Sequence, residues 1–236
     1  MNLILLAESD FVAPDRVRLD GLRSRHVLGV LGAGVGTELK VGRLQGELGR
    51  GVVTSIAEGK VELEVVFSDP PPAPLPVVLV LALPRPKVLR RTLAAAVTMG
   101  VKKIYLINSF RVEKSYWQSP RLGPDSLREI VYRALEQAGD TGPVEIVKVR
   151  RFRPFVEDRL PGLAAGRQAL FLHPDRAASA AGFTPRPPAL VAIGPEGGFI
   201  PFELERLAAA GLAPLSLGAR ILRVEQAVPA ILGRFL

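Results

Sequence analysis

The segment Ser68–Pro76, with the sequence SDPPPAPLP, constrains the fold more than any other part of the chain. Five of its nine residues are proline. Because proline lacks a backbone N–H and holds φ near −65°, such a run keeps the chain extended and cannot complete the hydrogen-bond ladder of a sheet. We therefore predict a linker over residues 69–76 that separates one domain, residues 1–68, from another, residues 77–236.

The sequence before the linker has the pattern of short β-strands. Val61, Leu63 and Val65 alternate with charged residues, which is the period of a half-buried strand. The apolar start of the chain indicates another strand. Glycines interrupt these runs at short intervals, so we predict a small β-barrel domain.

The sequence after the linker alternates between strand and helix patterns. The continuous apolar run 77–83 is typical of a strand covered on both faces, and further strands are predicted over residues 103–107, 144–149, 169–172 and 189–193. Helices are predicted near Val88–Met99, with Gly100 as a left-handed cap, and over Asp125–Ala138, with Asp125 or Ser126 as the N-cap and Gly139 at the C-terminal end. This alternation predicts an α/β domain with a mainly parallel sheet.

The composition excludes several classes of chemistry. The chain has no cysteine and two histidines, which excludes disulfides, thiolate zinc sites and a cysteine nucleophile and disfavours a histidine-rich metal centre. No apolar run reaches the ~18 residues that cross a bilayer, and the N-terminus lacks the basic region of a signal peptide. We expect a cytoplasmic protein with no metal and no membrane span.

The positive charge is concentrated after residue 68. Residues 1–68 carry 8 basic and 9 acidic side chains (8 − 9 = −1), and residues 69–236 carry 23 and 14 (23 − 14 = +9). Arginine outnumbers lysine 24 to 7, and arginine binds phosphate as a rigid fork and stacks on bases. This excess favours a nucleic-acid partner, although a GC-rich genome would also enrich arginine.

Three predicted strand ends near the C-terminus carry unusual residues. His173 follows one strand, Gly194–Gly198 (GPEGG) follows the next, and Gly218 follows a strand that is predicted to end at Leu217. Ligands in parallel sheets bind beyond the carboxyl ends of strands. These three ends are therefore candidate parts of one site.

The glycine turn has two readings. Gly197 and Gly198 can adopt φ > 0 and let a ligand approach the backbone closely. The segment lacks the glycine-lysine and dinucleotide signatures of phosphate loops, and Glu196 would repel phosphate. The turn is therefore either a cradle for a neutral or cationic ligand or a plain strand-to-helix turn.

The last segment, ARILRVEQAVPAIL, concentrates charge in one short connection. Arg220, Arg223 and Glu225 precede an apolar run that contains Pro229. Pro229 is compatible with a helix that begins near Glu225, because the first N–H groups of a helix have no internal partner. The charged trio then forms either part of a site or a set of surface ion pairs.

Together, IGPEGGF and LSLGARILRVEQA resemble the SPOUT superfamily of knotted S-adenosylmethionine-dependent RNA methyltransferases. Within it they most resemble the ribosomal small-subunit methyltransferase E family, which makes 3-methyluridine in 16S ribosomal RNA. The resemblance covers the whole chain: RSRHVLGVLGAGVGTELKVG is similar to that family's N-terminal domain, and KVLRRTLAAAVTMGVKKIYLINSFR and ALEQAGDTGPVEI are similar to its central segments.

The resemblance implies a fold and an assembly. It implies a SPOUT-type, mainly parallel sheet with a deep trefoil knot at the C-terminus, preceded by a small PUA-like β-barrel domain. It also implies a homodimer with cofactor pockets near the subunit interface, and the small ribosomal subunit as partner.

The resemblance also assigns a cofactor site. S-adenosylmethionine would lie among three loops, with Glu196 facing its cationic sulfonium. The residues implied are Leu172, His173, Ile193, Gly194, Pro195, Glu196, Gly197, Gly198, Leu217, Gly218, Ile221 and Leu222. The chain departs from the family at four positions: threonine is usual at Val224 and Gln226, and arginine is usual at Gly32 and Asp140.

Methylation of uridine at N3 requires removal of the N3 proton, which spreads negative charge onto O2 and O4. The site therefore needs a base, a nearby cation and in-line alignment with the methyl group. Glu225 is our candidate base, and Arg223 or Arg220 is the candidate charge stabiliser. The absence of cysteine agrees, since N3 methylation needs no covalent nucleophile.

RNA is expected to bind through basic side chains in both domains. The candidates are Arg23, Arg25, His26, Arg85, Lys87, Arg90 and Arg91. The arginine-rich segment is otherwise a solvated helix face, and His26 is otherwise structural. His173 is either a pocket wall or a cap at a strand end.

Two further functions remain open at this stage. A SPOUT enzyme could modify another RNA target, such as a ribose 2′-hydroxyl or a transfer RNA base. A chain with this fold could also be a non-catalytic RNA-binding or ribosome-assembly factor, and the altered sequence RVEQA favours keeping that alternative.

Overall fold

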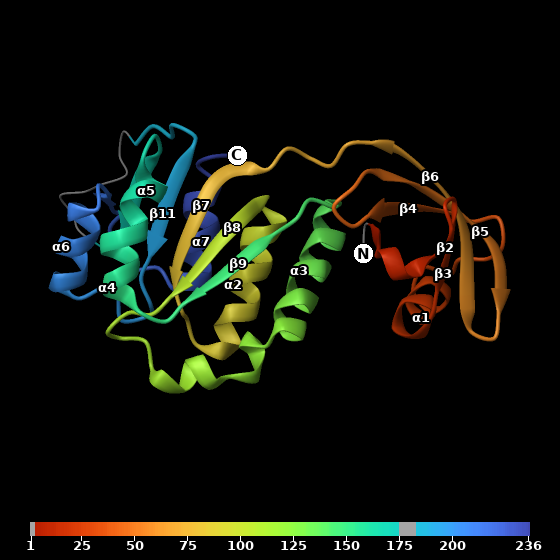
Figure 1. Ribbon diagram of the computed structural model, residues 1–236, viewed down its shortest axis with the longest axis horizontal. Helices are drawn as coiled ribbons and strands as arrows, with labels where there is room; N and C mark the ends of the chain where they lie inside the picture. The colour runs from red at the N-terminus through yellow and green to blue at the C-terminus, as the bar shows by residue number, and fades with distance from the viewer. Residues whose placement is uncertain (1–2, 175–182) are drawn as a thin grey trace. The chain divides into compact units, whose positions relative to one another are not determined.

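The computed structural model describes residues 3–174 and 183–236 (Figure 1). The chain divides into two compact units. The N-terminal unit consists of Met1–Ala73 with Tyr132–Pro143, and the C-terminal unit consists of Pro74–Val131 with Val144–Leu236. Each unit is described by itself.

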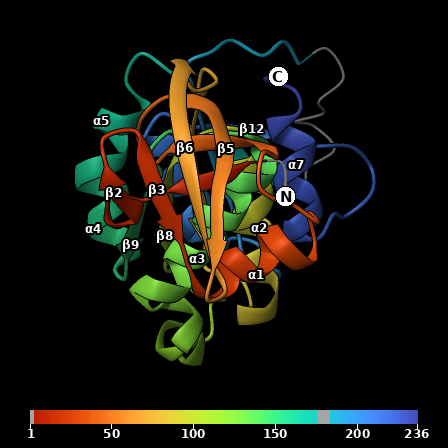
Figure 2. The same cartoon turned by 90° about the vertical axis from the view of Figure 1, so that its right-hand side faces the viewer.

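The N-terminal unit is built on a mixed six-stranded sheet, β1-β4-β5-β6-β3-β2 (Figure 2). Only β1 and β4 pair in parallel; the other neighbours are antiparallel. No ladder joins the edge strands β1 and β2 among the described residues, so closure into a barrel stays a prediction. The elements are β1 (Ile4–Leu6), a 3-10 helix (Glu8–Asp10), β2 (Phe11–Ala13), β3 (Arg16–Leu19), α1 (Gly21–Gly29), β4 (Glu38–Arg43), β5 (Leu48–Ala57) and β6 (Lys60–Asp69).

The alternation predicted for the N-terminal sheet is confirmed. Val61, Leu63 and Val65 are each at most 3% exposed and belong to one apolar core with Leu6 and Val17. The predicted first strand is β1. The predicted linker, residues 69–76, begins on the last residue of β6 and ends inside β7.

The C-terminal unit is built on a six-stranded sheet of order β12-β10-β11-β7-β8-β9, in which every pairing is parallel. The prediction of a mainly parallel α/β sheet is therefore confirmed. The strands are β7 (Leu75–Ala82), β8 (Val101–Ile107), β9 (Glu145–Val149), β10 (Gln168–Leu172), β11 (Ala189–Ile193) and β12 (Ala213–Leu215). Every residue of β11 is buried, as expected for a strand covered on both faces.

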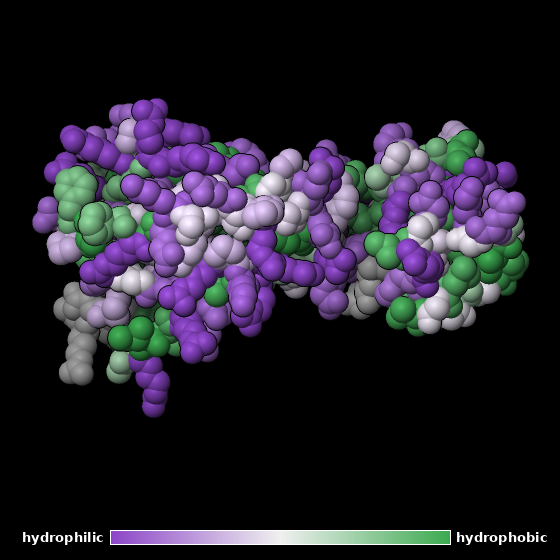
Figure 3. Space-filling model, turned by 90° about the horizontal axis from the view of Figure 1, so that it is seen from below, coloured by the Kyte–Doolittle hydropathy of each residue, from purple (hydrophilic) through white to green (hydrophobic). Residues whose placement is uncertain are grey.

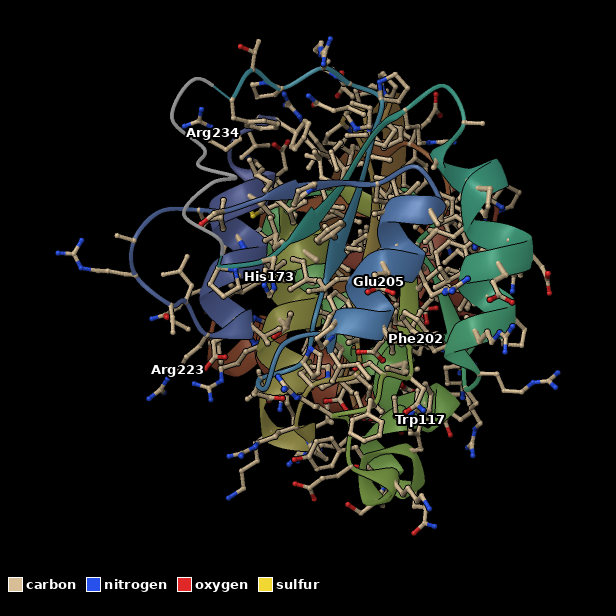
Figure 4. All side chains as sticks on the ribbon, turned by 90° about the vertical axis from the view of Figure 1, so that its left-hand side faces the viewer. Trp117, His173, Phe202, Glu205, Arg223 and Arg234 are labelled. Carbon is tan, nitrogen blue, oxygen red and sulfur yellow. The ribbon has the colours of Figure 1, made fainter. Side chains whose placement is uncertain are left out.

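Helices cover both faces of this sheet. Figures 2 and 4 show α2 and α7 on one side and α4 and α5 on the other, and α2 packs against α7. The helices are α2 (Pro86–Thr98), α3 (Pro124–Ala138), α4 (Phe152–Pro154), α5 (Leu160–Ala164), α6 (Pro201–Ala209) and α7 (Val224–Leu232). Shorter helical segments are the 3-10 helices Lys114–Gln118 and Pro120–Leu122 and the π-helical Phe155–Arg159. The second half of α3 belongs to the N-terminal unit.

The predicted helix ends are partly confirmed. Gly100 has φ +90° and Gly139 has φ +67°, so both end their helices in the left-handed region. The prediction that Asp125 or Ser126 caps α3 is wrong, because the helix begins earlier, at Pro124. Asp125 lies in the first turn and pairs with Arg128 at 3.4 Å.

Two further predictions about the C-terminal segment are corrected. The strand predicted to end at Leu217 ends at Leu215, since pairing with β10 stops there. The helix expected to begin near Glu225 is α7, which begins at Val224, but Pro229 is its sixth residue and so lies beyond the first four N–H groups. It therefore leaves the carbonyl of Glu225 without the usual N–H donor four residues ahead.

No helix among the described residues is both long enough and apolar enough to span a membrane.

Candidate active site

Three neighbouring strands end in register at one edge of the sheet. Leu172, the last residue of β10, is paired with Ile193 of β11 on one side and with Leu215 of β12 on the other. The N–H of His173 donates to the carbonyl of Leu215 at 3.1 Å and continues this alignment by one residue. The loops that follow these strands therefore emerge side by side, as the parallel sheet predicts.

The same edge gathers three helix N-termini. The loop after β7 leads into α2, the loop after β11 into α6, and the loop after β12 into α7. The first N–H groups of a helix lack internal partners and carry partial positive charge. Each of these helix starts therefore favours a negatively charged group beside it, and Glu196, Glu203 and Glu225 lie at the starts of α2, α6 and α7.

The Gly194–Gly198 loop is a tight turn formed by backbone. The N–H of Gly198 donates to the carbonyl of Pro195 at 2.7 Å, and Gly198 has φ +73°. A Cβ at Gly194 would lie 3.1 Å from the backbone nitrogen of Phe199. A Cβ at Gly197 would lie 2.9 Å from Cδ of Arg111, whose guanidinium donates to the Gly197 carbonyl. A side chain at Gly194 or Gly197 would therefore force a neighbour to move, and one at Gly198 would be strained by its positive φ.

Glu196 has a partner that the sequence did not indicate. Its Oε1 accepts a hydrogen bond from the backbone N–H of Arg85 at 2.9 Å. Arg85 is the N-cap residue of α2, so the carboxylate satisfies a free N–H at a helix start, where negative charge is favourable. Glu196 thereby ties the loop after β11 to the loop after β7.

The third loop is open to solvent. Leu217 is half-buried, whereas Gly218–Arg223 are exposed. Ile221 is 85% exposed and Leu222 is 37% exposed. Gly218 has φ +124°, a conformation that side chains with a Cβ rarely adopt. This loop presents apolar side chains that nothing in the described chain covers fully.

The charged trio lies at and before the start of α7. Arg223 is the N-cap residue, Glu225 is half-buried in the first turn, and Arg220 lies in the exposed loop. Figure 4 shows His173 and Arg223 on the α7 side of the sheet. No ion pair joins the three charged side chains within residues 3–174 and 183–236, so they are not a closed surface network.

Both departures in RVEQA have structural reasons. Val224 is 5% exposed, so its methyl groups pack where a hydroxyl would need a partner. Gln226 Oε1 accepts a hydrogen bond from the backbone N–H of Arg223 at 3.2 Å and thus caps α7. The family's other changed positions are an exposed Gly32 with φ +63° and a buried Asp140, whose Oδ1 accepts from the N–H of Gly142 at 2.7 Å.

The four basic candidates on α2 lie at its exposed start. Arg85, Lys87, Arg90 and Arg91 are all exposed. Burial raises the pKa of Tyr116, with a further contribution from Glu113, while Arg85 acts in the opposite direction. The start of α2 is therefore a positive surface at the same edge as the three loops.

The three basic candidates on α1 differ in their surroundings. Arg23 is held inside the N-terminal unit: Nη1 donates to Asp10 Oδ2 at 2.7 Å and to the Leu5 carbonyl at 3.2 Å, and Nη2 donates to Asp10 Oδ1. The hydrogen bond to Asp10 raises the pKa of Arg23, against the opposing effect of burial. Arg25 is exposed, and Nε2 of His26 is buried without a partner in the described chain.

Sequence reasoning missed the residues that organise the loop after β8. Glu203, in the first turn of α6 and 3% exposed, accepts the N–H of Phe110 at 2.7 Å and that of Ile200 at 3.0 Å. The neighbouring Ser109 is 2% exposed, and its hydroxyl has no partner among the described residues. A glutamate three residues after a helix cap was the available signal for Glu203; nothing local indicated its contact 93 residues away.

Comparisons with known proteins agree with this arrangement. Residues 71–236 match the family model described as RNA methyltransferase domain. A search of curated proteins finds no match.

Solved structures of similar fold include three methyltransferases. The putative methyltransferase of Legionella pneumophila, in complex with the cofactor S-adenosylmethionine, is 21% identical with a TM-score of 0.78, over 99% of this chain and 96% of that chain. The ribosomal RNA small subunit methyltransferase E of Neisseria gonorrhoeae, bound to S-adenosylmethionine, is 24% identical with a TM-score of 0.74, over 99% and 95%. A probable rRNA-methyltransferase of Porphyromonas gingivalis is 23% identical with a TM-score of 0.74, over 98% and 95%.

The family model covers more than half of the chain, and these structures share its fold over nearly their whole length. The chain therefore belongs to the RNA methyltransferase domain family of the ribosomal small-subunit methyltransferase E type.

Proposed function

We propose that this protein transfers a methyl group from S-adenosylmethionine to N3 of a uridine in 16S ribosomal RNA of the small subunit. The observation that carries the proposal is the register of β12, β10 and β11, which brings the three motif-bearing loops together at one sheet edge. Membership of the RNA methyltransferase domain family supports the reaction class.

The residues at this edge fit the cofactor. The Gly194–Gly198 turn is tight, since a Cβ at Gly194 would lie 3.1 Å from the backbone nitrogen of Phe199, and the half-buried Leu172 and the exposed Ile221 and Leu222 supply apolar side chains on the other two loops. S-adenosylmethionine supplies an electrophilic methyl group on a cationic sulfonium. The solved methyltransferases of Legionella and Neisseria contain this cofactor. We propose that Leu172, His173, Ile193–Gly198, Leu217, Gly218, Ile221 and Leu222 bind it.

We propose roles for the charged trio in the transfer. Glu225, half-buried at the start of α7, accepts the N3 proton of uridine. Arg223 and Arg220 stabilise the negative charge that develops on O2 and O4. The trio suits this role because its members are not paired with one another in the described chain and stand beside the third loop.

The RNA is proposed to lie along the exposed start of α2, where Arg85, Lys87, Arg90 and Arg91 would hold phosphates. Arg25 is the exposed arginine of α1 and is the proposed contact in the N-terminal unit. Arg23 forms an ion pair with Asp10. RNA binding by Arg23 and by His26 stays a prediction.

We further propose a C-terminal trefoil knot, a PUA-like N-terminal domain and a homodimer. The knot is supported by the path of the chain: it leaves β12 at the sheet edge, yet α7 packs against β11 and α2. The chain therefore returns from the edge strand past β10, which a knotted path also requires.

The test is methyl transfer from labelled S-adenosylmethionine to small ribosomal subunits that lack their native 3-methyluridine. Glu225→Gln and Arg223→Ala should each reduce the turnover number at least ~100-fold while cofactor binding, measured by calorimetric titration, is retained. Wild-type turnover in both variants would remove the assignment. If the wild-type protein does not bind S-adenosylmethionine, a non-catalytic RNA-binding factor becomes the better description.

A further inference from the structure

Phe110 is an exposed aromatic side chain in the loop that follows β8. It is 77% exposed, more than any other aromatic residue among the large exposed apolar side chains of the described chain. A single exposed apolar side chain is ordinary on a protein surface. Phe110 stands out because its backbone is fixed while its ring is left uncovered.

The loop that carries Phe110 is held from both sides. The buried carboxylate of Glu203 accepts the Phe110 N–H at 2.7 Å. On the other side, the Asn108 N–H donates to the Val149 carbonyl at 2.9 Å, and the Trp117 indole donates to Asn108 Oδ1 at 2.8 Å. A buried carboxylate is costly unless it is well bonded, and Glu203 meets this requirement by fixing the backbone of Phe110 as well as that of Ile200.

The next residue, Arg111, connects this loop to the glycine turn. Its guanidinium donates to the carbonyl of Gly197. Glu203 makes a second link, because it also accepts the N–H of Ile200, which follows the turn. Phe110 is thus fixed beside the loop that we propose binds the cofactor.

Phe110 is nevertheless outside the three proposed cofactor loops. These follow β12, β10 and β11, whereas Phe110 follows β8, and β7 lies between β8 and β11. Two strand spacings are ~10 Å. The ring therefore belongs to the rim of the site and not to the cofactor pocket itself.

The segment that follows Phe110 carries exposed charges of both signs, with cations in excess, since Glu113 is its one exposed carboxylate. Lys114 and Arg121, on the two following 3-10 helices, are exposed. The guanidinium of Arg150 lies 5.6 Å from the centroid of the Trp117 ring. In Figure 3 the visible face of the C-terminal unit is mostly hydrophilic. A fixed ring among cations matches a single-stranded RNA, whose bases stack on aromatic side chains while its phosphates meet the cations.

Resting on the proposed function, we propose that Phe110 is a positioning residue that stacks on an unpaired RNA base next to the methylated nucleotide. The ring holds the RNA strand at the rim so that the target base enters the site. Because only an aromatic face can replace it, tyrosine and tryptophan preserve the interaction, and leucine, of similar size and apolarity, does not.

The experiment compares Phe110→Ala, Phe110→Leu, Phe110→Tyr and Phe110→Trp with the wild-type chain. The substrate is the small ribosomal subunit without its native 3-methyluridine, and KM for the subunit is measured beside the Kd of S-adenosylmethionine. We expect alanine and leucine to raise that KM ~10-fold, tyrosine and tryptophan to stay within ~2-fold, and the cofactor Kd and the melting temperature to stay unchanged. Val66→Ala, a change at a side chain that is 68% exposed in the N-terminal unit, is the matched control.

Two results would overturn the inference. One is an unchanged KM for the subunit in Phe110→Leu. The other is a weaker cofactor affinity in Phe110→Ala with no change in that KM, which would place the ring in the cofactor pocket. Failure of the proposed function is distinguishable, because the wild-type protein would then transfer no methyl group.

Discussion

At the scale of single residues, the pair Arg23–Asp10 shows how one arginine can stabilise a unit instead of binding a ligand. Asp10 is 6% exposed, and both of its oxygens accept from the guanidinium of Arg23. Leaving a buried carboxylate unpaired is strongly destabilising. Sequence alone could not separate Arg23 from Arg25, because the difference lies in which of the two faces Asp10.

We predict that Arg23→Ala lowers the free energy of unfolding by about 3 kcal/mol. Arg25→Ala, two residues away on the same helix, should leave that free energy nearly unchanged and weaken RNA binding instead. Urea denaturation and RNA titration of both variants measure the two effects. An Arg23→Ala protein as stable as wild type would contradict the role given to this pair.

A second residue-scale prediction concerns pH. Burial raises the pKa of Glu136 above its ordinary value of 4.5, while the N–H of Leu5 and the charge of Arg23 act in the opposite direction. A carboxyl group whose pKa is raised by folding binds more protons in the folded state, so stability falls as pH rises from the ordinary pKa through the raised one.

The Glu136→Gln variant should therefore lose this fall in stability. It keeps an acceptor for the Leu5 N–H, and above this pH window it should be more stable than the wild-type chain, whereas at lower pH the two should converge. Thermal melts between pH 3 and pH 8 provide the comparison. Parallel profiles for the two proteins would show that Glu136 does not titrate abnormally.

At the scale of elements, helix starts fix the loops of the site. Glu196 joins the loop after β11 to the start of α2, Glu203 joins the start of α6 to the loop after β8, and Gln226 caps α7. The strands and helices themselves follow from apolar periodicity, and β11 was predicted with its observed bounds, Ala189–Ile193. The contacts between loops could not be predicted from apolar periodicity, because they join residues as far as 111 positions apart.

We predict that Glu196→Ala lowers the free energy of unfolding by about 1 kcal/mol, because α2 loses its capping acceptor. That loss corresponds to a melting temperature lower by about 2–4 °C. Glu196→Gln, which retains an acceptor oxygen, should melt between the two. Titration of both variants with S-adenosylmethionine then shows whether the carboxylate of Glu196 also interacts with the cationic sulfonium of the cofactor. An unchanged melting temperature in Glu196→Ala would remove the capping role.

At the scale of the whole molecule, the proline-rich segment marks a change of fold, but the units are not two continuous pieces of chain. The N-terminal unit includes Tyr132–Pro143, where the Thr141 carbonyl accepts the N–H of Gln45 at 2.8 Å. A Cβ at Gly42 would lie 2.4 Å from Cγ2 of Thr141, so this packing is close. The proline-rich linker can be recognised from its composition. The return of residues 132–143 to the N-terminal unit cannot, because it depends on contacts between segments that are far apart in the sequence.

We predict that a fragment of residues 1–73 lacks a cooperative thermal transition, because it loses the segment that packs against Gly42 and Gln45. The full chain under the same conditions is the control, followed by circular dichroism. A sharp, reversible transition in the fragment would show that residues 132–143 are dispensable for this unit.

The reaction product tests the central claim most directly. Wild-type protein would be incubated with S-adenosylmethionine and small ribosomal subunits lacking their native 3-methyluridine, and the ribosomal RNA would be digested for nucleoside mass spectrometry. The account predicts new 3-methyluridine that is absent when the protein or the cofactor is omitted and that is lost in Glu225→Gln. A methylated nucleoside of another kind, or no methylated product from a protein that binds the cofactor, would contradict it.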